Sequence, residues 1–221
     1  MIEPRWFLDN DWYAGGIPAN VHVGREVYLD TSYSFAAFHS RQSPGLTLGH
    51  ASGVYDRTNF FVGPQGMVTV GPYTCLNATT IICNERIEIG AHCLLAWGVV
   101  LSDTAPWPAA PRERRRTALR AAAADPMRLF PAASCARPVV LEDNVWIGFD
   151  SVILPGVTLG RGCIIGCKTV IAENVPPYAV VVGTPPRIVR TLEPDDDEAK
   201  RERARQEYAR AWLGGAGGTK P

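Results

Sequence analysis

The side chains that could accept a proton near neutral pH are few and lie early in the chain. Four histidines occur, and none follows position 92: His22, His39, His50 and His92. Histidine is the most frequent general base in enzymes, because its unperturbed pKa lies close to neutrality. These histidines lack zinc-ligand spacing and the six cysteines contain no C-x-x-C, so the pattern favours no zinc site. Acid–base chemistry therefore depends on which of these groups, or which carboxylate, the fold brings to one place.

Residues 141–176 repeat with a period of six and indicate the scaffold that positions such groups. A helix would need apolar spacings of three and four, and an ordinary strand would need alternation. A period of six is typical of a hexapeptide β-solenoid, with three short strands per coil, and its strictness disfavours a β-sandwich. We expect the first and fifth residue of each block to point into a prism: Leu141, Ile147, Ile153, Leu159, Ile165, Ile171, and Val145, Ser151, Val157, Cys163, Thr169, Val175.

The same phase can be followed upstream, which gives about six coils. The four earlier coils are expected to present these inward residues: Val23, Leu29, Phe35; Leu48, Val54, Phe60; Val70, Leu76, Ile82; Ile89, Leu95, Leu101. Every phase break follows the third block of a coil, so the insertions should leave the prism from a single corner. Insertions on one side of a solenoid often build its working face. The longest, residues 102–140, is too long for a plain turn.

Four segments are expected along the chain. The first segment, an N-terminal cap, carries Trp6, Phe7, Trp12 and Tyr13. These aromatic side chains either have a chemical role or only pack against apolar surface. Within the insertion loop, Arg112 to Ala124 lack Gly and Pro and favour a short helix, whose arginines are either solvated or phosphate-binding. A second helix is expected from Glu193 to Leu213. The segments are an N-terminal cap (1–22), a β-helix domain (23–190, insertion loop 102–140), a C-terminal helix (191–213) and a disordered tail (214–221).

Charge, apolar runs and cysteine usage indicate which partners and which compartment the sequence favours. With 22 basic and 22 acidic residues the formal charge is zero, so bulk charge favours neither nucleic acid nor an anionic membrane. No apolar run approaches the ~20 residues of a membrane span. Cys93 and Cys163 occupy inward positions of the repeat, where a thiol acts as a small apolar group. We interpret the cysteines as reduced and structural, which predicts a cytoplasmic protein.

Three motifs of the last coils resemble those of the hexapeptide-repeat acyltransferases, in particular the xenobiotic, galactoside and maltose O-acetyltransferase group. The motifs are DNVWIG, LPGVTLG and VPPYAVVVGTPPRIVR, and the similarity is strongest over 139–190. The resemblance implies an all-β, left-handed parallel β-helix, against the usual right-handed preference of parallel crossovers. It further implies a homotrimer with sites between subunits. The donor would be acetyl-CoA or another acyl-CoA, attacked by a hydroxyl or amine of a small-molecule acceptor.

On the donor side the resemblance carries over residue by residue. Cys167 and Ala172 match small residues beside the pantetheine arm, and Trp146 matches the tryptophan of the NVWIG motif. Arg187 and Arg190 match basic residues near the CoA phosphates, for which a guanidinium is well suited. The alternatives are that Trp146 is only a subunit-interface residue and that Arg187 contacts only solvent.

On the acceptor side the resemblance fails at one position. The turn that holds the family's catalytic histidine is LSDTAPWP here, with Pro106 or Trp107 in its place. Asp103 lies in that turn, matches an acidic residue of the family, and is the first candidate base. His39, on the first insertion at the same corner, is the second, about three coils or ~14 Å away. His50 and His92 fall at a different corner.

Two functions are therefore left open by the sequence. The first is an acyltransferase with an altered base, acting on a sugar or specialised metabolite. The second is a non-catalytic trimeric relative that binds a ligand or partner. A γ-class carbonic anhydrase, which shares the solenoid, is disfavoured because its three zinc-binding histidines have no counterpart in the scattered histidines of this chain.

Overall fold

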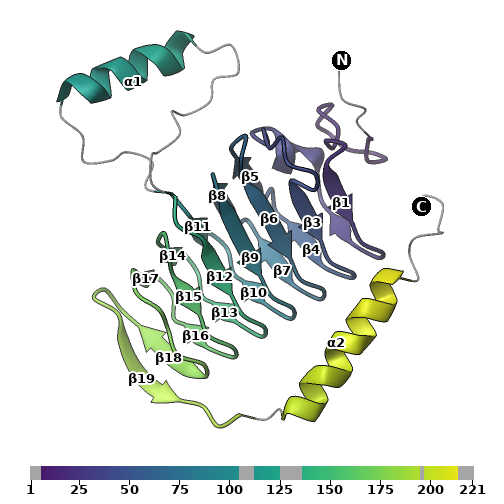
Figure 1. The fold of residues 1–221 in the computed structure, drawn as a ribbon, viewed down its shortest axis with the longest axis vertical. Coiled ribbons are helices and arrows are strands. Elements are labelled where there is room, and N and C mark those ends of the chain that lie inside the picture. The colour runs from purple at the N-terminus through teal and green to yellow at the C-terminus, as the bar shows by residue number, and fades with distance from the viewer. Residues whose placement is uncertain (1–5, 105–111, 125–135, 195–196, 214–221) are drawn as a thin grey trace.

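The computed structural model describes residues 6–104, 112–124, 136–194 and 197–213, which wind into a three-sided parallel β-helix (Figure 1). Successive strands join three sheets in turn, and strands of neighbouring coils pair in parallel. Among the strands of the described residues, β19 alone pairs antiparallel, with β18. Sheet 1 holds β1 (Val21–Val23), β3 (Leu46–Leu48), β6 (Met67–Val70), β9 (Arg86–Ile89), β12 (Val139–Leu141) and β15 (Thr158–Leu159). Sheet 2 holds β2 (Tyr28–Leu29), β4 (Gly53–Tyr55), β7 (Cys75–Asn77), β10 (Leu94–Leu95), β13 (Trp146–Ile147), β16 (Ile164–Ile165), β18 (Ala179–Val182) and β19 (Arg187–Thr191). Sheet 3 holds β5 (Asn59–Val62), β8 (Thr80–Cys83), β11 (Val100–Ser102), β14 (Val152–Ile153) and β17 (Val170–Ile171).

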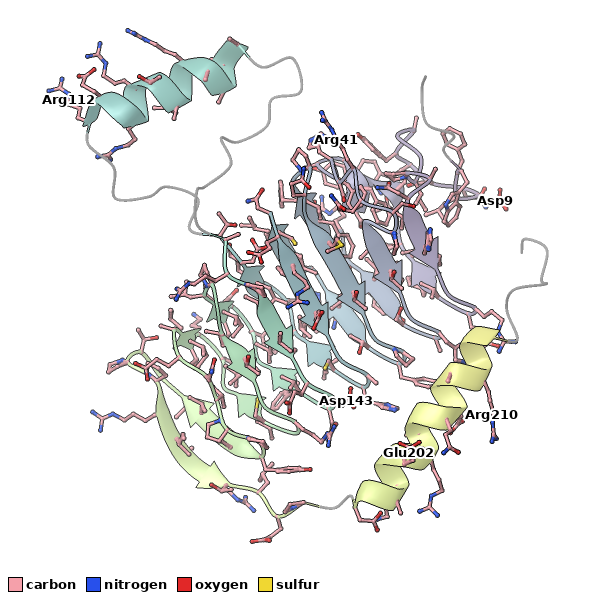
Figure 2. All side chains as sticks on the ribbon, in the orientation of Figure 1. Asp9, Arg41, Arg112, Asp143, Glu202 and Arg210 are labelled. Atoms are coloured by element: carbon pink, nitrogen blue, oxygen red, sulfur yellow. The ribbon has the colours of Figure 1, made fainter. Side chains whose placement is uncertain are left out.

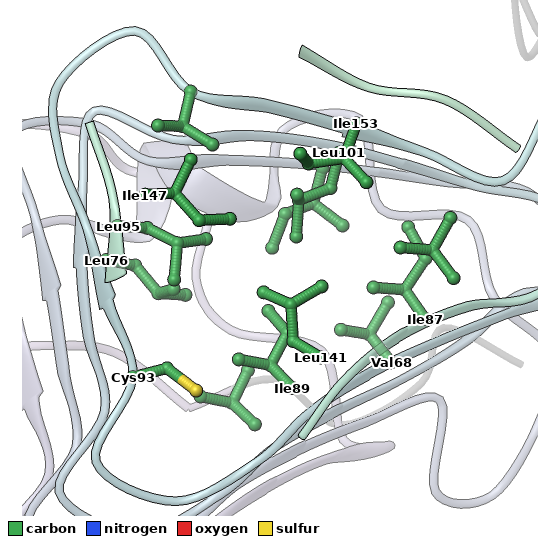
Figure 3. Packing of buried hydrophobic residues seen from close by; sticks show 14 of the residues in the cluster. Val68, Leu76, Ile87, Ile89, Cys93, Leu95, Leu101, Leu141, Ile147 and Ile153 are labelled. Atoms are coloured by element: carbon green, nitrogen blue, oxygen red, sulfur yellow. The ribbon is translucent and has the colours of Figure 1, made fainter. Parts of the chain in front are cut away.

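The inward column of the last two coils is as the period of six predicts. Figure 3 shows aliphatic side chains from the three walls meeting in the middle of the prism. All six block-opening residues from Leu141 to Ile171 are at most 2% exposed, and the six fifth-position residues are also buried. Burial of aliphatic surface of this kind contributes about 1.5–3 kcal/mol per large side chain. The six-residue phasing is therefore confirmed where the repeat is regular.

In the third coil the expected phase is wrong by one residue. Ile81, not Ile82, points inward; it is fully buried and pairs with Phe60 and Leu101 of the coils on either side. The turn between β7 and β8 is one residue shorter than the regular repeat, and Ala78 closes it with a left-handed φ of 41°. A tighter corner brings the next residue into the wall one position early.

The first coil is incomplete. Phe35 is buried as expected, but it lies on a 3-10 helix, η1 (Ser32–Phe35), instead of on a strand of sheet 3. Its ring stacks on Phe60 of the second coil at 5.6 Å. Val23 and Leu29 are only half-buried, because they lie at the end of the solenoid where no further coil covers them.

The insertions leave the prism at one edge, as predicted. We name the edges by the sheets they join: corner 1–2, corner 2–3 and corner 3–1. The interruptions 36–45, 63–66, 84–85 and 103–138 all connect sheet 3, or η1 in its place, to sheet 1. They therefore share corner 3–1.

The longest insertion is closed at its base. Thr104 and Ala136 form an antiparallel bridge, and the Arg137 N–H donates to the Asp103 carbonyl at 2.8 Å. The coil can therefore continue from β11 to β12 as though the insertion were a short turn. The predicted helix within it is confirmed as α1 (Arg112–Ala124), with the described arginine side chains exposed (Figure 2).

The two ends of the solenoid differ. At the start, Trp6 pairs with Ile17, and Asp11 accepts hydrogen bonds from Thr31 and Ser32, which ties the segment to η1. At the other end, helix α2 spans Glu198–Leu213, so the expected start at Glu193 is wrong. β19 continues to Thr191, and the Leu192 N–H still donates to Tyr178 in the last coil. No helix among the described residues is long and apolar enough to cross a membrane.

Candidate functional site

Two of the predicted donor residues lie along sheet 2 and its edge at corner 2–3. Trp146 on β13 is 42% exposed and stands in register with Leu94 of β10 and Ile164 of β16. Cys167 follows β16 and is exposed. Gly148 leaves space next to Cys167, because a Cβ at position 148 would lie 2.9 Å from the Cys167 sulfur. Cys167 and Gly148 thus form a strip of small residues near the bulky, exposed Trp146 and Phe149.

The two predicted phosphate-binding arginines lie on the final hairpin of the same sheet. Arg190 is in register with Val180, and Arg187 with Val182. Val180 in turn pairs with Ile164, which pairs with Trp146, so one cross-strand row runs from Trp146 to Arg190. Two exposed guanidinium groups at the end of such a row suit the phosphates of a nucleotide.

Ala172 is not brought to this strip within one chain. It is exposed and follows β17 of sheet 3, whereas Cys167 precedes that strand. The two small residues therefore lie at different corners of the last coil, Cys167 at corner 2–3 and Ala172 at corner 3–1.

Asp103 is fully buried, and its carboxylate is occupied by the backbone of the neighbouring coil. It accepts from the N–H groups of Asn84 at 2.9 and 3.0 Å, Glu85 at 2.7 Å and Arg86 at 3.0 Å, and from the Thr104 hydroxyl at 2.7 Å. These donors occupy both carboxylate oxygens, which are buried away from solvent. The contacts are those of a group that organises a turn, which argues against a proton-transfer role for Asp103.

His39 lies at the same corner but well away from Asp103. Its backbone N–H donates to Val62 of β5, next to the bridge between Phe38 and Val62. Val62 pairs with Cys83, and Ile82 with Ser102, which places Asp103 three rungs further along the axis. Three rungs span about 14 Å. The structure thus does not bring the two candidate bases together.

The two remaining candidate histidines occupy corner 1–2, away from the insertions. The Tyr73 ring lies between them, with ring centroids 5.4 Å from His50 and 5.1 Å from His92. His50 also contacts the Arg25 carbonyl through Nδ1 at 2.9 Å. His92 stacks on Tyr73, whereas His50 meets the same ring edge-on, so both imidazoles are part of an aromatic cluster on the turns of this corner.

The inward cysteines are thiols of low reactivity. Burial raises the pKa of the thiols of Cys93 and Cys163 to about 12 each, and it also raises the pKa of Cys75 and Cys83. All five cysteines in the described residues are free thiols. Over the same part of the chain, no three His, Cys, Asp or Glu side chains are grouped so that they could hold a metal ion.

Two features at corner 2–3 were not anticipated from the sequence. Trp97 and Phe149 stack with ring centroids 5.6 Å apart and an angle of 10° between the rings; we call this pair the aromatic ridge. Both residues come two positions after an inward residue of the repeat. Their position at the same corner could therefore have been predicted from the six-residue period. The second feature, a cavity of about 440 Å³ lined by Trp12, Asp30, Asp56 and Arg57, joins segments far apart in sequence.

Comparison with known proteins identifies the repeat. Residues 138–173 match the family described as bacterial transferase hexapeptide (six repeats). Galactoside O-acetyltransferase of Lactococcus lactis is 29% identical over 136 residues, which cover 62% of this chain and 58% of that protein. Chloramphenicol acetyltransferase of Agrobacterium fabrum is 39% identical over 64 residues, 29% of this chain and 31% of that protein. The chain thus spans less than two thirds of the length of these relatives.

Among solved structures, a hexapeptide-repeat-containing acetyltransferase of Vibrio cholerae, crystallised with acetyl coenzyme A, is similar over most of the solenoid. It is 29% identical with a TM-score of 0.51, and the match covers 68% of this chain and 72% of that one. The fold class is the left-handed parallel β-helix, and the resemblance to hexapeptide-repeat acyltransferases is confirmed.

Proposed function

We propose that the protein is an acyltransferase that moves an acetyl or other acyl group from acyl-CoA to a hydroxyl or amine of a small molecule. The observation that carries the proposal is the row on sheet 2 from Trp146 to Arg190, with Arg187 beside it and the strip of small residues at Gly148 and Cys167. The strip would take the pantetheine arm and the arginines the phosphates. The Vibrio cholerae relative crystallised with acetyl coenzyme A supports this donor.

The reaction forms one bond and breaks one. The acceptor oxygen or nitrogen bonds to the thioester carbonyl carbon, the carbon–sulfur bond breaks, and the acceptor proton ends on the CoA thiol. A neutral amine attacks without prior loss of a proton, whereas a hydroxyl benefits from a base within hydrogen-bond reach. For a hydroxyl acceptor the proposed base is His39 of a second copy, which would reach the acceptor at the boundary between copies, because Asp103 is enclosed by its five hydrogen bonds.

We propose a homotrimer with each site shared between two copies. Such an arrangement would let Ala172 of one copy approach the strip at Cys167 of another. It would also cover the large apolar side chains on the outside of sheet 2, among them Leu94 and Trp146, which are 43% and 42% exposed. The five free thiols favour a reducing compartment, the cytoplasm.

The function is tested by incubating the protein with acetyl-CoA and matched panels of alcohols and amines while following release of the CoA thiol. Acceptor-dependent thiol release supports the transferase. His39→Ala should slow transfer to alcohols by about 10²-fold and leave transfer to amines nearly unchanged. CoA binding without transfer to any acceptor would instead favour a trimeric ligand-binding protein, the reading that the enclosed Asp103 supports.

A further inference from the structure

The cavity at corner 2–3 brings together an aromatic ring and three charged side chains from three parts of the chain. Trp12 comes from the N-terminal segment, Asp30 follows β2, and Asp56 with Arg57 follow β4. The volume of about 440 Å³ is in the range of small-molecule sites, and the cavity is open to solvent, because all four lining residues are exposed. The lining carries two carboxylates and one guanidinium, so it has an excess of one negative charge.

The walls of the cavity are held in place by the surrounding coils. The Asp56 carboxylate accepts from the indole N–H of Trp97 at 2.6 Å. Asp56 and Arg57 have φ values of 50° and 58°, and two successive left-handed residues persist only where the structure holds them. The buried Thr58 provides that hold, because its hydroxyl donates to Tyr55 and accepts from the Thr79 N–H.

The Trp12 wall is tied down in the same way. The neighbouring Asp11 carboxylate accepts from the Thr31 hydroxyl and the Ser32 N–H, each at 2.7 Å. The Trp12 ring lies 5.4 Å from Tyr33 of η1 and remains 65% exposed. An exposed indole on a fixed segment offers a face for a cation, since the ring quadrupole attracts positive charge.

The same corner leads from the cavity to the strip assigned to the donor. Trp97, which bonds to Asp56, stacks on Phe149, and the Phe149 carbonyl accepts from the Lys168 N–H next to Cys167. Asp56 and Cys167 are therefore four rungs apart on one edge, about 19 Å. A ligand anchored in the cavity could extend along the aromatic ridge toward a thioester in the strip.

We propose that this cavity is the anchoring part of the acceptor subsite and that it holds a protonated amine at one end of an elongated polar acceptor, long enough to reach the donor strip about 19 Å away. The proposal rests on the transferase function above and adds the class of acceptor. The ammonium lies between the carboxylates of Asp30 and Asp56 and against the Trp12 ring, while Arg57 donates to neighbouring oxygen atoms. This ammonium is an anchor; the group that is acylated is another hydroxyl or amine, nearer the donor.

The proposal is tested by calorimetry without any donor, with D-glucosamine and D-glucose as probes at slightly acidic pH, where the amine carries a proton. The wild type should bind glucosamine about tenfold or more tightly than glucose. The double variant D30N/D56N, which keeps shape and removes charge, should bind the two sugars equally. Trp12→Ala should weaken glucosamine binding more than glucose binding.

Glu207→Gln is the matched control, because it removes an exposed carboxylate from α2, a helix that contributes no lining residue to the cavity, and it should keep the wild-type preference. Equal affinity of the wild type for the two sugars, no measurable binding of glucosamine, or an undiminished preference in D30N/D56N would overturn the assignment. CoA affinity, measured separately, should be the same in all variants. If the wild type does not bind CoA, the result contradicts the transferase function but not the cavity as a site for an amine. The two failures are therefore distinguishable.

Discussion

Asp103 serves the backbone of a neighbouring coil, and this sets what its substitution should do. Asn keeps the shape but turns an NH₂ group toward the N–H groups of Asn84, Glu85 and Arg86, so donors face donors. Asp103→Asn should lower the free energy of unfolding by about 2 kcal/mol, the range for hydrogen bonds to a buried charged group. Denaturant unfolding measures this loss. A D103N protein as stable as wild type but without transfer activity would return Asp103 to the role of a base.

We expect Arg187 to contribute to the affinity for the CoA donor through its positive charge. Arg187→Glu places a carboxylate where we assign a CoA phosphate, and this should weaken CoA binding about tenfold or more. Dephospho-CoA should lose less if the contact is to the 3′-phosphate. Calorimetry measures both, with Arg203→Glu on the exposed face of α2 as the control. Unchanged CoA affinity in R187E would refute the assignment.

Asp11 makes the stability of the N-terminal segment depend on pH. Burial raises the pKa of its carboxyl, but hydrogen bonds from Ser32, Thr31 and Tyr13 outweigh this and lower it from 3.8 to about 2. A pKa lowered by folding means that the ionised group stabilises the fold above about pH 3.8, and that this contribution disappears as the pH falls toward 2. Asp11→Asn should therefore melt earlier than wild type at pH 7 and equally at the lowest pH. A difference in Tm that does not shrink on acidification would contradict this account.

At the scale of the strand, the inward column should tolerate size changes far better than charge. Ile153 is fully buried between Leu101 and Ile171, so Ile153→Asp buries a carboxylate without a partner and should prevent folding of the coil. Ile153→Val removes one methylene and should cost only about 1 kcal/mol. Circular dichroism and thermal melts compare the two. The neighbouring Val152, on the outer side of β14, is the control: Val152→Asp should fold.

For the whole molecule, the outer side of sheet 2 carries the prediction. We expect light scattering at micromolar concentration to give three times the 24.0 kDa chain mass. Trp146→Glu puts a charge among the apolar side chains proposed to meet a second copy, and it should shift the protein toward monomer while weakening CoA binding. A monomeric wild type would remove both the trimer and the shared site.

Much of the fold could be predicted from the sequence because every block of a solenoid adopts the same local structure. Each block from Leu141 to Ile171 meets the same neighbours one coil above and below, so a period of six suffices to assign the inward residues and the corner of the insertions. The motif matches at Trp146, Arg187 and Arg190 depend on the same regular register, and these three residues do share one sheet.

Only the tertiary structure decided the features in which coils differ from one another. The inward place of Ile81 depends on one shortened turn, and the role of Asp103 depends on three N–H groups that precede it by 17 to 19 residues. The contact between Trp97 and Asp56 joins residues 41 positions apart, and Trp12 reaches the same corner from the N-terminal segment. A repeat pattern carries the spacing between coils but not the side chains that meet at an irregular turn. The candidate donor strip could therefore be predicted from the sequence, whereas the cavity proposed for the acceptor could not.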